Sequence, residues 1–252
     1  MFRKGILAIF TLLTFLGAND VRAYLNWDIY SDAVIKEGDI YNVVRVYDIP
    51  PDHTTVNMVG GFVDAMTTYD YSTLNVTAGQ VSSLGAIDHS TVNISGNAEI
   101  WNAGANEWGN VNISGGNLTG AGATGHGVLN ISGDATIWYV GFSQSGTMNM
   151  SGGQIDAVSV YDSAVVNLLG GLIVEGIGTR LGHFEGLINV YGYHLGKTCA
   201  GGVCSVYGFF PNGSAFSINV AEAVYPRVNL IPEPATLVLL GLGGLIVNRR
   251  KE

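Results

Sequence analysis

Two tryptophans carry the side chains best suited to hold a ligand. Trp101 and Trp138 each follow an isoleucine, and Trp108 and Tyr139 lie close to them in the sequence. The flat face of an indole can stack on the apolar face of a sugar ring, and aromatic side chains line many ligand sites. Trp101 and Trp138 are therefore possible glycan contacts. The alternative is a local aromatic patch that loops or a neighbouring molecule cover.

A second set of polar side chains recurs at the centre of a short phrase of the type Val-Asn-Ile-Ser-Gly. The asparagines of the regular copies are Asn75, Asn93, Asn112, Asn130, Asn149 and Asn167. Exposed amides can bind sugars, but stacked asparagines also hydrogen-bond to one another along a cross-β array. The ladder alone explains the regular spacing, so we interpret this column as structural.

Catalytic chemistry has weaker support. Gly125-His126-Gly127 resembles one signature of polygalacturonases, but the Asp-Asp dipeptide and the Arg-Ile-Lys segment of that family are absent from the sequence. Pectate-lyase chemistry needs a basic residue, and the array offers only Arg180. A glycosidase pair, for which Glu99 and Asp134 are candidates, needs carboxyl groups about 5–9.5 Å apart. We predict no catalytic residue and no enzyme; a polysaccharide lyase or hydrolase on a β-helix scaffold is the alternative.

Charge is scarce and unevenly placed. Charged residues make up 12% of the chain and the net charge is −9, which argues against a nucleic-acid partner. No Lys or Arg lies between Arg45 and Arg180, where the acidic residues are Asp48, Asp52, Asp64, Asp70, Asp88, Glu99, Glu107, Asp134, Asp156, Asp162 and Glu175. Such a surface could bind Ca²⁺ or repel anionic polysaccharide. We expect these residues to share no column of the repeat and to solvate the surface, with no metal and no cofactor.

The elements that must position these residues form one repeat array. Successive phrase asparagines from Asn57 to Asn189 are 18, 18, 19, 18, 19, 18 and 22 residues apart. An apolar column keeps the same step through Val63, Val81, Ile100, Leu118, Ile137, Ile155 and Ile173. Alternating apolar and polar residues indicate strands with one buried face, and the period is too short for helical repeats or propeller blades. The pattern predicts an all-β fold: a single-stranded parallel β-helix (β-solenoid) of about nine 18–19-residue coils, with right-handed winding favoured over a left-handed triangular form.

The array defines the domain boundaries. Residues 53–225 form the β-solenoid, with an insertion at 192–217 after which Ile218-Asn219-Val220 resembles the phrase. Residues 24–52 lack the phrase and are the expected N-terminal cap, because solenoid ends expose unpaired strands. Cys199 and Cys204 lie five apart in the insertion and predict a local disulfide in an exported protein. Metal binding by the pair is the alternative, with His194 the nearest further ligand.

The N-terminus is typical of a secretory signal peptide at residues 1–23. Arg3 and Lys4 precede the apolar run Gly5–Ala18, and Val21-Arg22-Ala23 supplies small residues for a signal peptidase.

The C-terminus, residues 226–252, reads as a linker and a tripartite tail. Pro232-Glu233-Pro234 precedes an apolar run of 11 residues, Leu237–Val247, and a basic end with Arg249 and Arg250. That run is well short of the ~20 residues that span a bilayer, and the basic end favours a cytoplasmic C-terminus. The tail resembles the PEP-CTERM sorting signal of Gram-negative bacteria. The resemblance implies transient anchoring in the inner membrane, processing by an exosortase, and association with exopolysaccharide and biofilm.

Taken together, these features predict an exported structural protein of the cell surface or extracellular matrix, associated with exopolysaccharide. A carbohydrate-binding adhesin is a further alternative.

Overall fold

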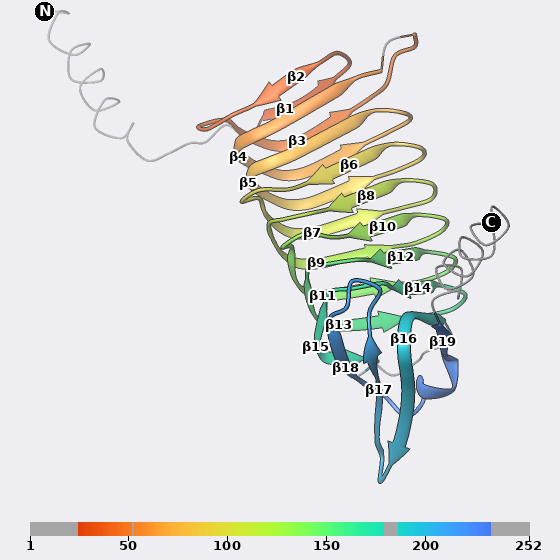
Figure 1. The fold of residues 1–252 in the computed structure, drawn as a ribbon. Coiled ribbons are helices and arrows are strands. Elements are labelled where there is room, and N and C mark those ends of the chain that lie inside the picture. Colours follow the sequence, from red (N-terminus) through yellow and green to blue (C-terminus); the bar gives the residue numbers. More distant parts are fainter. Residues whose placement is uncertain (1–24, 52, 179–185, 233–252) are drawn as a thin grey trace, which may run out of the picture.

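The chain folds into a rod of stacked parallel coils (Figure 1). The computed structural model describes residues 25–51, 53–178 and 186–232. The expected signal peptide, and the tail beyond Pro232, lie outside the described residues. The predicted all-β solenoid is confirmed, with about eight turns where about nine were expected.

Each coil contributes a strand to each of two parallel stacks that run along the rod. The asparagine stack consists of β2 (Ala33–Ile35), the first halves of β4 (Thr55–Thr68) and β5 (Thr73–Ala86), β6 (Thr91–Ile94), β8 (Asn110–Ile113), β10 (Val128–Ile131), β12 (Thr147–Met150), β14 (Val165–Leu168), the start of β16 (Leu187–Ala200) and β19 (Val228–Pro232). The second stack consists of β1 (Leu25–Ile29), β3 (Ile40–Val46), the second halves of β4 and β5, β7 (Glu99–Ala105), β9 (Asn117–Ala123), β11 (Thr136–Phe142), β13 (Gln154–Val160) and β15 (Leu172–Ile177). Equivalent residues of successive copies pair directly, so each repeat position becomes a column along the rod.

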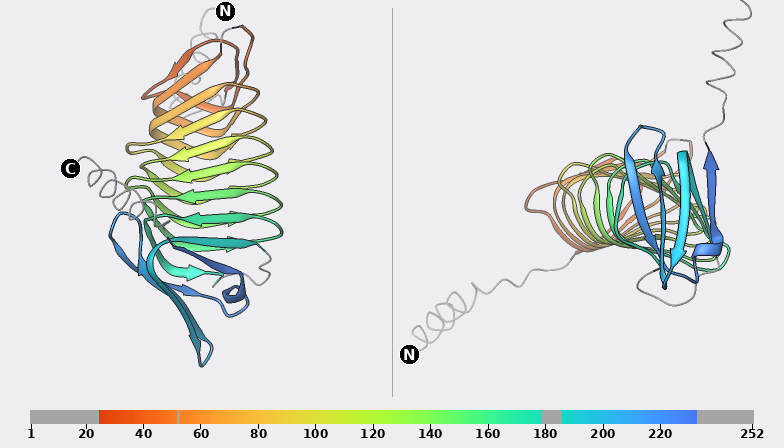
Figure 2. Two further views of the ribbon diagram at one scale, coloured as in Figure 1. Left: turned by 45° about the vertical axis from the view of Figure 1, so that its right-hand side comes forward. Right: turned by 60° about the horizontal axis from the view of Figure 1, so that its bottom comes forward.

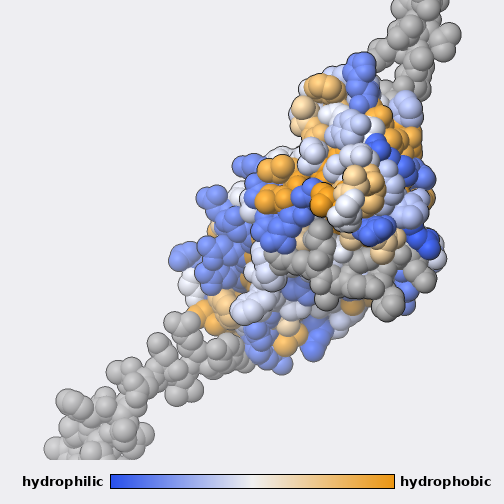
Figure 3. Space-filling view, turned by 90° about the horizontal axis from the view of Figure 1, so that it is seen from below, coloured by the Kyte–Doolittle hydropathy of each residue, from blue (hydrophilic) through white to orange (hydrophobic). Residues whose placement is uncertain are grey.

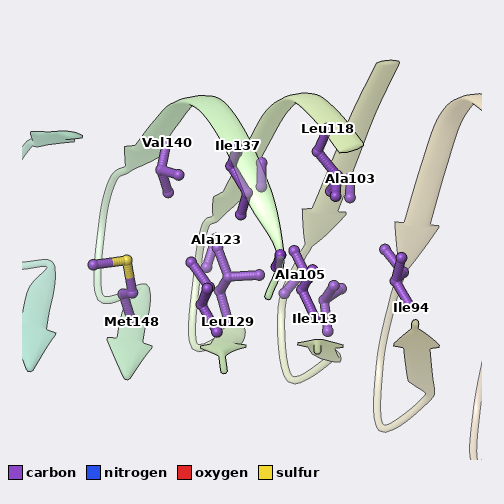
Figure 4. Packing of buried hydrophobic residues seen from close by; sticks show 14 of the residues in the cluster. Ile94, Ala103, Ala105, Ile113, Leu118, Ala123, Leu129, Ile137, Val140 and Met148 are labelled. Carbon is purple, nitrogen blue, oxygen red and sulfur yellow. The ribbon is translucent and has the colours of Figure 1, made fainter. Parts of the chain in front are cut away.

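The core is built from these columns. Ile94, Ile113, Leu129 and Met148 are fully buried and face the interior from the asparagine stack (Figure 4). The second stack supplies alternating buried residues in the same way, and the two sets meet across the rod. Because every coil lies against the coils before and after it, removing one inward side chain affects three coils.

The strands of the second stack bend where the alternation is broken. In β7, Ile100 and Ala103 are buried while both residues between them, Trp101 and Asn102, are exposed. Two successive outward residues are incompatible with a straight strand, in which side chains alternate between faces. The bend therefore places Trp101 on a corner of the coil. In β9 and β11 two residues that are not buried likewise stand between two buried ones.

The two turns of each coil use left-handed backbone. After the asparagine strand, glycines such as Gly96 (φ +62°) pass so close to the preceding coil that a Cβ would collide with the carbonyl oxygen of Thr77. After the second strand, most of the left-handed residues are not glycine. They have φ between 51° and 58° and are Asp70, Asp88, Glu107, Gln144 and Asp162. Aspartate tolerates this conformation better than most residues.

That column corrects the expectation that the acidic residues share no repeat position. Asp70, Asp88 and Glu107 occupy equivalent turns of three successive coils. Side chains of this column also bond to the neighbouring coil: Gln144 N donates to Asp162 Oδ2 (2.9 Å), and Gly125 N donates to Gln144 Oε1 (2.9 Å). The column is exposed to solvent, where repulsion between like charges is screened.

The segment expected to be an N-terminal cap is part of the solenoid. β1 pairs in parallel with β3, and β2 pairs in parallel with β4. Val34 stands opposite Asn57, where the phrase would have an asparagine. Buried Ile29, Ile35 and Val44 fill the core in this segment. The phrase is therefore not required for a coil to form, since the inward apolar residues alone define it.

The C-terminal end departs from the repeat. β16 and β17 (Val203–Phe209) form an antiparallel hairpin that projects beyond the last coil, and β18 (Ala215–Val220) returns beside β17 (Figures 1 and 2). Ile218-Asn219-Val220 lies in β18 and not in the asparagine stack, so its resemblance to the phrase was misleading. The stack continues at Asn229 in β19, within the segment expected to be a linker. Seen from below, hydrophobic surface is interspersed with hydrophilic surface at this end (Figure 3).

A pair of substitutions tests the inward and outward assignment. Ile94→Asp buries an unpaired charge, and we expect the Tm to fall by about 10 °C or more, because such burial destabilises by several kcal/mol. Glu99→Gln changes an exposed side chain and should leave the Tm nearly unchanged. Thermal melts followed by circular dichroism measure both, and equal Tm values for the two variants would contradict the assignment.

Candidate binding groove

A groove of about 770 Å³ runs along the bent face of the second stack. The floor of the groove is formed by the edges of the column of Val81, Ile100 and Leu118. Its walls are two rows of outward side chains, and on each coil these are the residue before and the residue after the column position. The first row contains Phe62, Gln80, Glu99, Asn117 and Thr136. The second row contains Ser82, Trp101, Thr119, Trp138 and Asp156. From Phe62 to Asp156 the groove crosses five coil steps, a length of about 24 Å at ~4.8 Å per step.

Both tryptophans predicted as possible glycan contacts line this groove. Trp101 is 70% exposed and Trp138 is 52% exposed. They stand in the same row, separated by Thr119 on the intervening coil, so their backbones are about 9.6 Å apart along the rod. Two aromatic side chains with a polar residue between them can hold two rings of one extended ligand, with another ring of that ligand between those two.

The polar wall opposite is also ordered. Gln80 Nε2 donates a hydrogen bond to Glu99 Oε2 across one coil (2.8 Å). This contact fixes one carboxylate oxygen and leaves the other free to accept hydrogen bonds from hydroxyl groups. Asn117 and Thr136 continue the same row with an amide and a hydroxyl. Such side chains can donate hydrogen bonds to hydroxyl groups and accept hydrogen bonds from them.

The carboxylates of the groove are too widely separated for a glycosidase pair. Glu99 and Asp156 lie three coils apart, about 14 Å along the rod, whereas glycosidases place their carboxyl groups about 5–9.5 Å apart. Asp134 is not among the described residues that line the groove. No group of three or more His, Cys, Asp or Glu that could hold a metal occurs in the described part of the chain.

A column of aromatic and histidine rings is a second feature, which the sequence analysis did not predict. Five rings follow one another along the rod at the turn after the second strand and form a ring ladder: His53, Tyr71, His89, Trp108 and His126. The last four stack on one another, and His53 is tilted by 49° against Tyr71. The shortest step, between Trp108 and His126, joins ring centroids 4.2 Å apart. The sequence does contain the signal for it, since these five residues recur at the same 18–19-residue step as the repeat. The column is hard to recognise because its members are three different amino acids. The ladder places Trp108 and the Gly-His-Gly motif in turns, away from the groove.

The phrase asparagines form a continuous ladder. The side-chain Nδ2 of each donates to the Oδ1 of the asparagine one coil earlier, at 2.8–3.3 Å. The members are Asn57, Asn75, Asn93, Asn112, Asn130, Asn149, Asn167, Asn189 and Asn229. These amides are occupied by one another and stand on a different face from the groove.

The insertion carries the cysteine pair. Cys199 and Cys204 form a disulfide across the tip of the β16–β17 hairpin. Two residues before Cys199, Lys197 Nζ donates to the carbonyl oxygen of Val228 (3.0 Å) and lies 4.9 Å from the ring centroid of Tyr225. The disulfide closes a short loop at the hairpin tip, and Cys204 is itself buried and pairs with Val220 of β18.

Comparison with known families identifies the tail. Residues 230–251 match the PEP-CTERM protein-sorting motif. The chain is therefore an exported, cell-surface-directed protein that an exosortase sorts. The motif includes Pro232, which ends β19, while Glu233, Pro234, Arg249 and Arg250 lie outside the described residues. Neither curated proteins nor solved structures include a match to the chain. Within the described ranges, no helix is both long and apolar enough to cross a membrane.

The asparagine ladder generates a stability prediction. Asn112→Ala leaves two half-buried partners unpaired, Asn93 Oδ1 and Asn130 Nδ2, and should lower the free energy of unfolding by about 1–3 kcal/mol. Asn57→Ala, at the start of the ladder, leaves only Asn75 Nδ2 unpaired and should have a smaller effect. Urea unfolding of the two variants measures the difference; a larger loss at Asn57 would show that the ladder does not act through paired amides.

Proposed function

We propose that this protein is a structural component of the cell surface or extracellular matrix that associates with exopolysaccharide through the groove. The observation that carries the proposal is the placement of Trp101 and Trp138 in one row of an axial groove, two coils apart. A polymer lying along the rod would meet both indole faces and the polar row opposite. Export through the sorting motif brings the groove to the compartment where such polymers occur.

The proposed role is binding without catalysis. The two carboxylates in the groove are about 14 Å apart along the rod, beyond the range of a glycosidase pair. Glu99 is held by Gln80, as suits a fixed hydrogen-bond acceptor. In-register stacking also makes the groove stiff, because every wall residue stands on a strand and not on a loop.

The proposed itinerary follows from the tail. An apolar run of 11 residues is too short for a dependable permanent anchor, and the basic residues after it would retain it at the inner membrane. We propose that the precursor is anchored there transiently, and that the exosortase then cuts at or near Pro232-Glu233-Pro234. The released rod would reach the cell surface or the extracellular matrix.

Loss of the tryptophans tests the binding role. The exported protein should co-sediment with exopolysaccharide from the producing cells, and Trp101→Ala or Trp138→Ala should weaken this association about tenfold, the effect of removing an aromatic anchor worth ~1.4 kcal/mol. Trp108→Ala is the matched control, since Trp108 is similarly exposed but belongs to the ring ladder. Equal retention of all three variants would refute the groove as the contact, and depolymerisation of the polysaccharide would refute a purely binding role.

Processing generates a separate prediction. Mass spectrometry of protein released from native cells should recover peptides up to about Arg227 and none from Leu237 onward. Changing Pro232, Glu233 and Pro234 to alanine should leave an uncut precursor in the membrane fraction. Released protein that still carries Arg249 and Arg250 would contradict the proposed cleavage.

A further inference from the structure

The charges around the groove point to a narrower class of ligand. Glu99 stands in the first wall row and Asp156 in the second, and an adjoining hollow of about 390 Å³ at the N-terminal end of the groove adds Glu37 and Asp39. The two hollows share Phe62, Gln80 and Glu99, so they form one continuous path. No Lys or Arg is among the described residues that line either hollow. Every charged side chain on the path is therefore a carboxylate.

The sequence excludes a compensating cation from the central coils. The chain has no Lys or Arg between Arg45 and Arg180, which covers every coil that contributes to the wall rows. Arg45 is paired with Asp28 of the preceding coil (3.2 Å), and the next cation in that direction, Lys36, is not among the residues that line the adjoining hollow. A polyanion lying in the groove would face fixed negative charge along its length, within the Debye length of about 8 Å at physiological ionic strength.

We propose that the ligand of this groove is an uncharged polysaccharide, bound as an extended chain parallel to the rod axis, and that anionic polysaccharides are excluded. This inference rests on the proposed binding function and specifies its ligand. Trp101 and Trp138 stack on sugar faces, which needs no charge. Gln80, Asn117, Thr119 and Thr136 supply amides and hydroxyls for sugar hydroxyl groups, and Glu99 accepts from them.

The parallel orientation follows from the shape of the groove. It extends about 24 Å along the rod, while its two wall rows are only two residues apart across each strand, about 6.6 Å. A chain crossing the rod would meet one coil and at most one tryptophan. A chain along the rod meets Trp101, Thr119 and Trp138 in order on three successive coils.

Separated native polysaccharide tests the inference. Exopolysaccharide from the producing cells is divided by anion exchange into an unretained neutral fraction and a retained anionic fraction. Each fraction is offered to the exported protein, as recovered from the producing cells, at physiological ionic strength in a co-sedimentation assay. We expect the protein to co-sediment with the neutral fraction. The Trp101→Ala, Trp138→Ala double variant should lose this association, and Trp108→Ala should keep it. We expect at least tenfold weaker retention by the anionic fraction.

The outcomes separate the two proposals. Preferential, tryptophan-dependent retention by the anionic fraction would overturn the inference about charge while leaving the proposed function in place. Retention by neither fraction would overturn the proposed function itself.

A charge-reversed variant, Glu99→Lys with Asp156→Lys, tests whether the carboxylates cause the exclusion of anionic polysaccharide. This variant should gain retention by the anionic fraction, and that gain should fall as salt is added. A charge-reversed variant that folds, as judged by circular dichroism, and still rejects the anionic fraction would show that the carboxylates do not exclude it.

Discussion

The whole molecule depends on the in-register stacking of parallel coils. Backbone hydrogen bonds hold equivalent positions of successive copies about 4.8 Å apart, so that one residue type at one repeat position becomes a column. The apolar columns make the core, the asparagine column makes an amide ladder, and the two columns flanking Ile100 make the walls of the groove. The proposed function depends on two positions in the second wall row. Tryptophan stands there on two coils, whereas other coils have serine, threonine or aspartate at the same position.

Stacking also constrains where charge can lie. Like charges at one position of successive coils would repel across a single strand spacing. In the groove this is avoided, because Glu99 stands between Gln80 and Asn117. At the opposite turn, Asp70, Asp88 and Glu107 do follow one another, but in left-handed turns open to solvent. The groove can therefore carry negative charge on a face without a cation, because Glu99 and Asp156 stand on separate coils and Glu99 is hydrogen-bonded to the neutral side chain of Gln80.

Period and alternation were sufficient to predict the architecture, since both are local and repeat many times. The sequence also identified Trp101 and Trp138 as outward-facing on coils two apart, because each follows an inward isoleucine. It could not show that they line one groove, because the walls are two rows of side chains from successive coils, and the bend beside the second row is revealed only by the burial of Ala103. The ring ladder was overlooked because stacking of His, Tyr and Trp conserves ring geometry and not residue type. Both ends were misassigned because the phrase was used as the marker of a coil. Val34 lies in the asparagine stack although the phrase is absent there, and Asn219 lies outside that stack although the phrase is present.

The sorting motif overlaps the last strand of the fold, so the position of the exosortase cut decides whether that strand stays intact. The motif begins at residue 230, while β19 extends from Val228 to Pro232. Asn229 donates to Asn189 and closes the amide ladder, and Leu230 packs against the core. A cut at or after Pro232, as proposed, leaves both contacts in place. A cut before Val228 would strip the last strand from the asparagine stack and remove the carbonyl oxygen of Val228 to which Lys197 Nζ of the hairpin donates. After a cut at or beyond Pro232, the last coil therefore keeps its strand in the asparagine stack, because β19 pairs with β16 through residues that precede the cut.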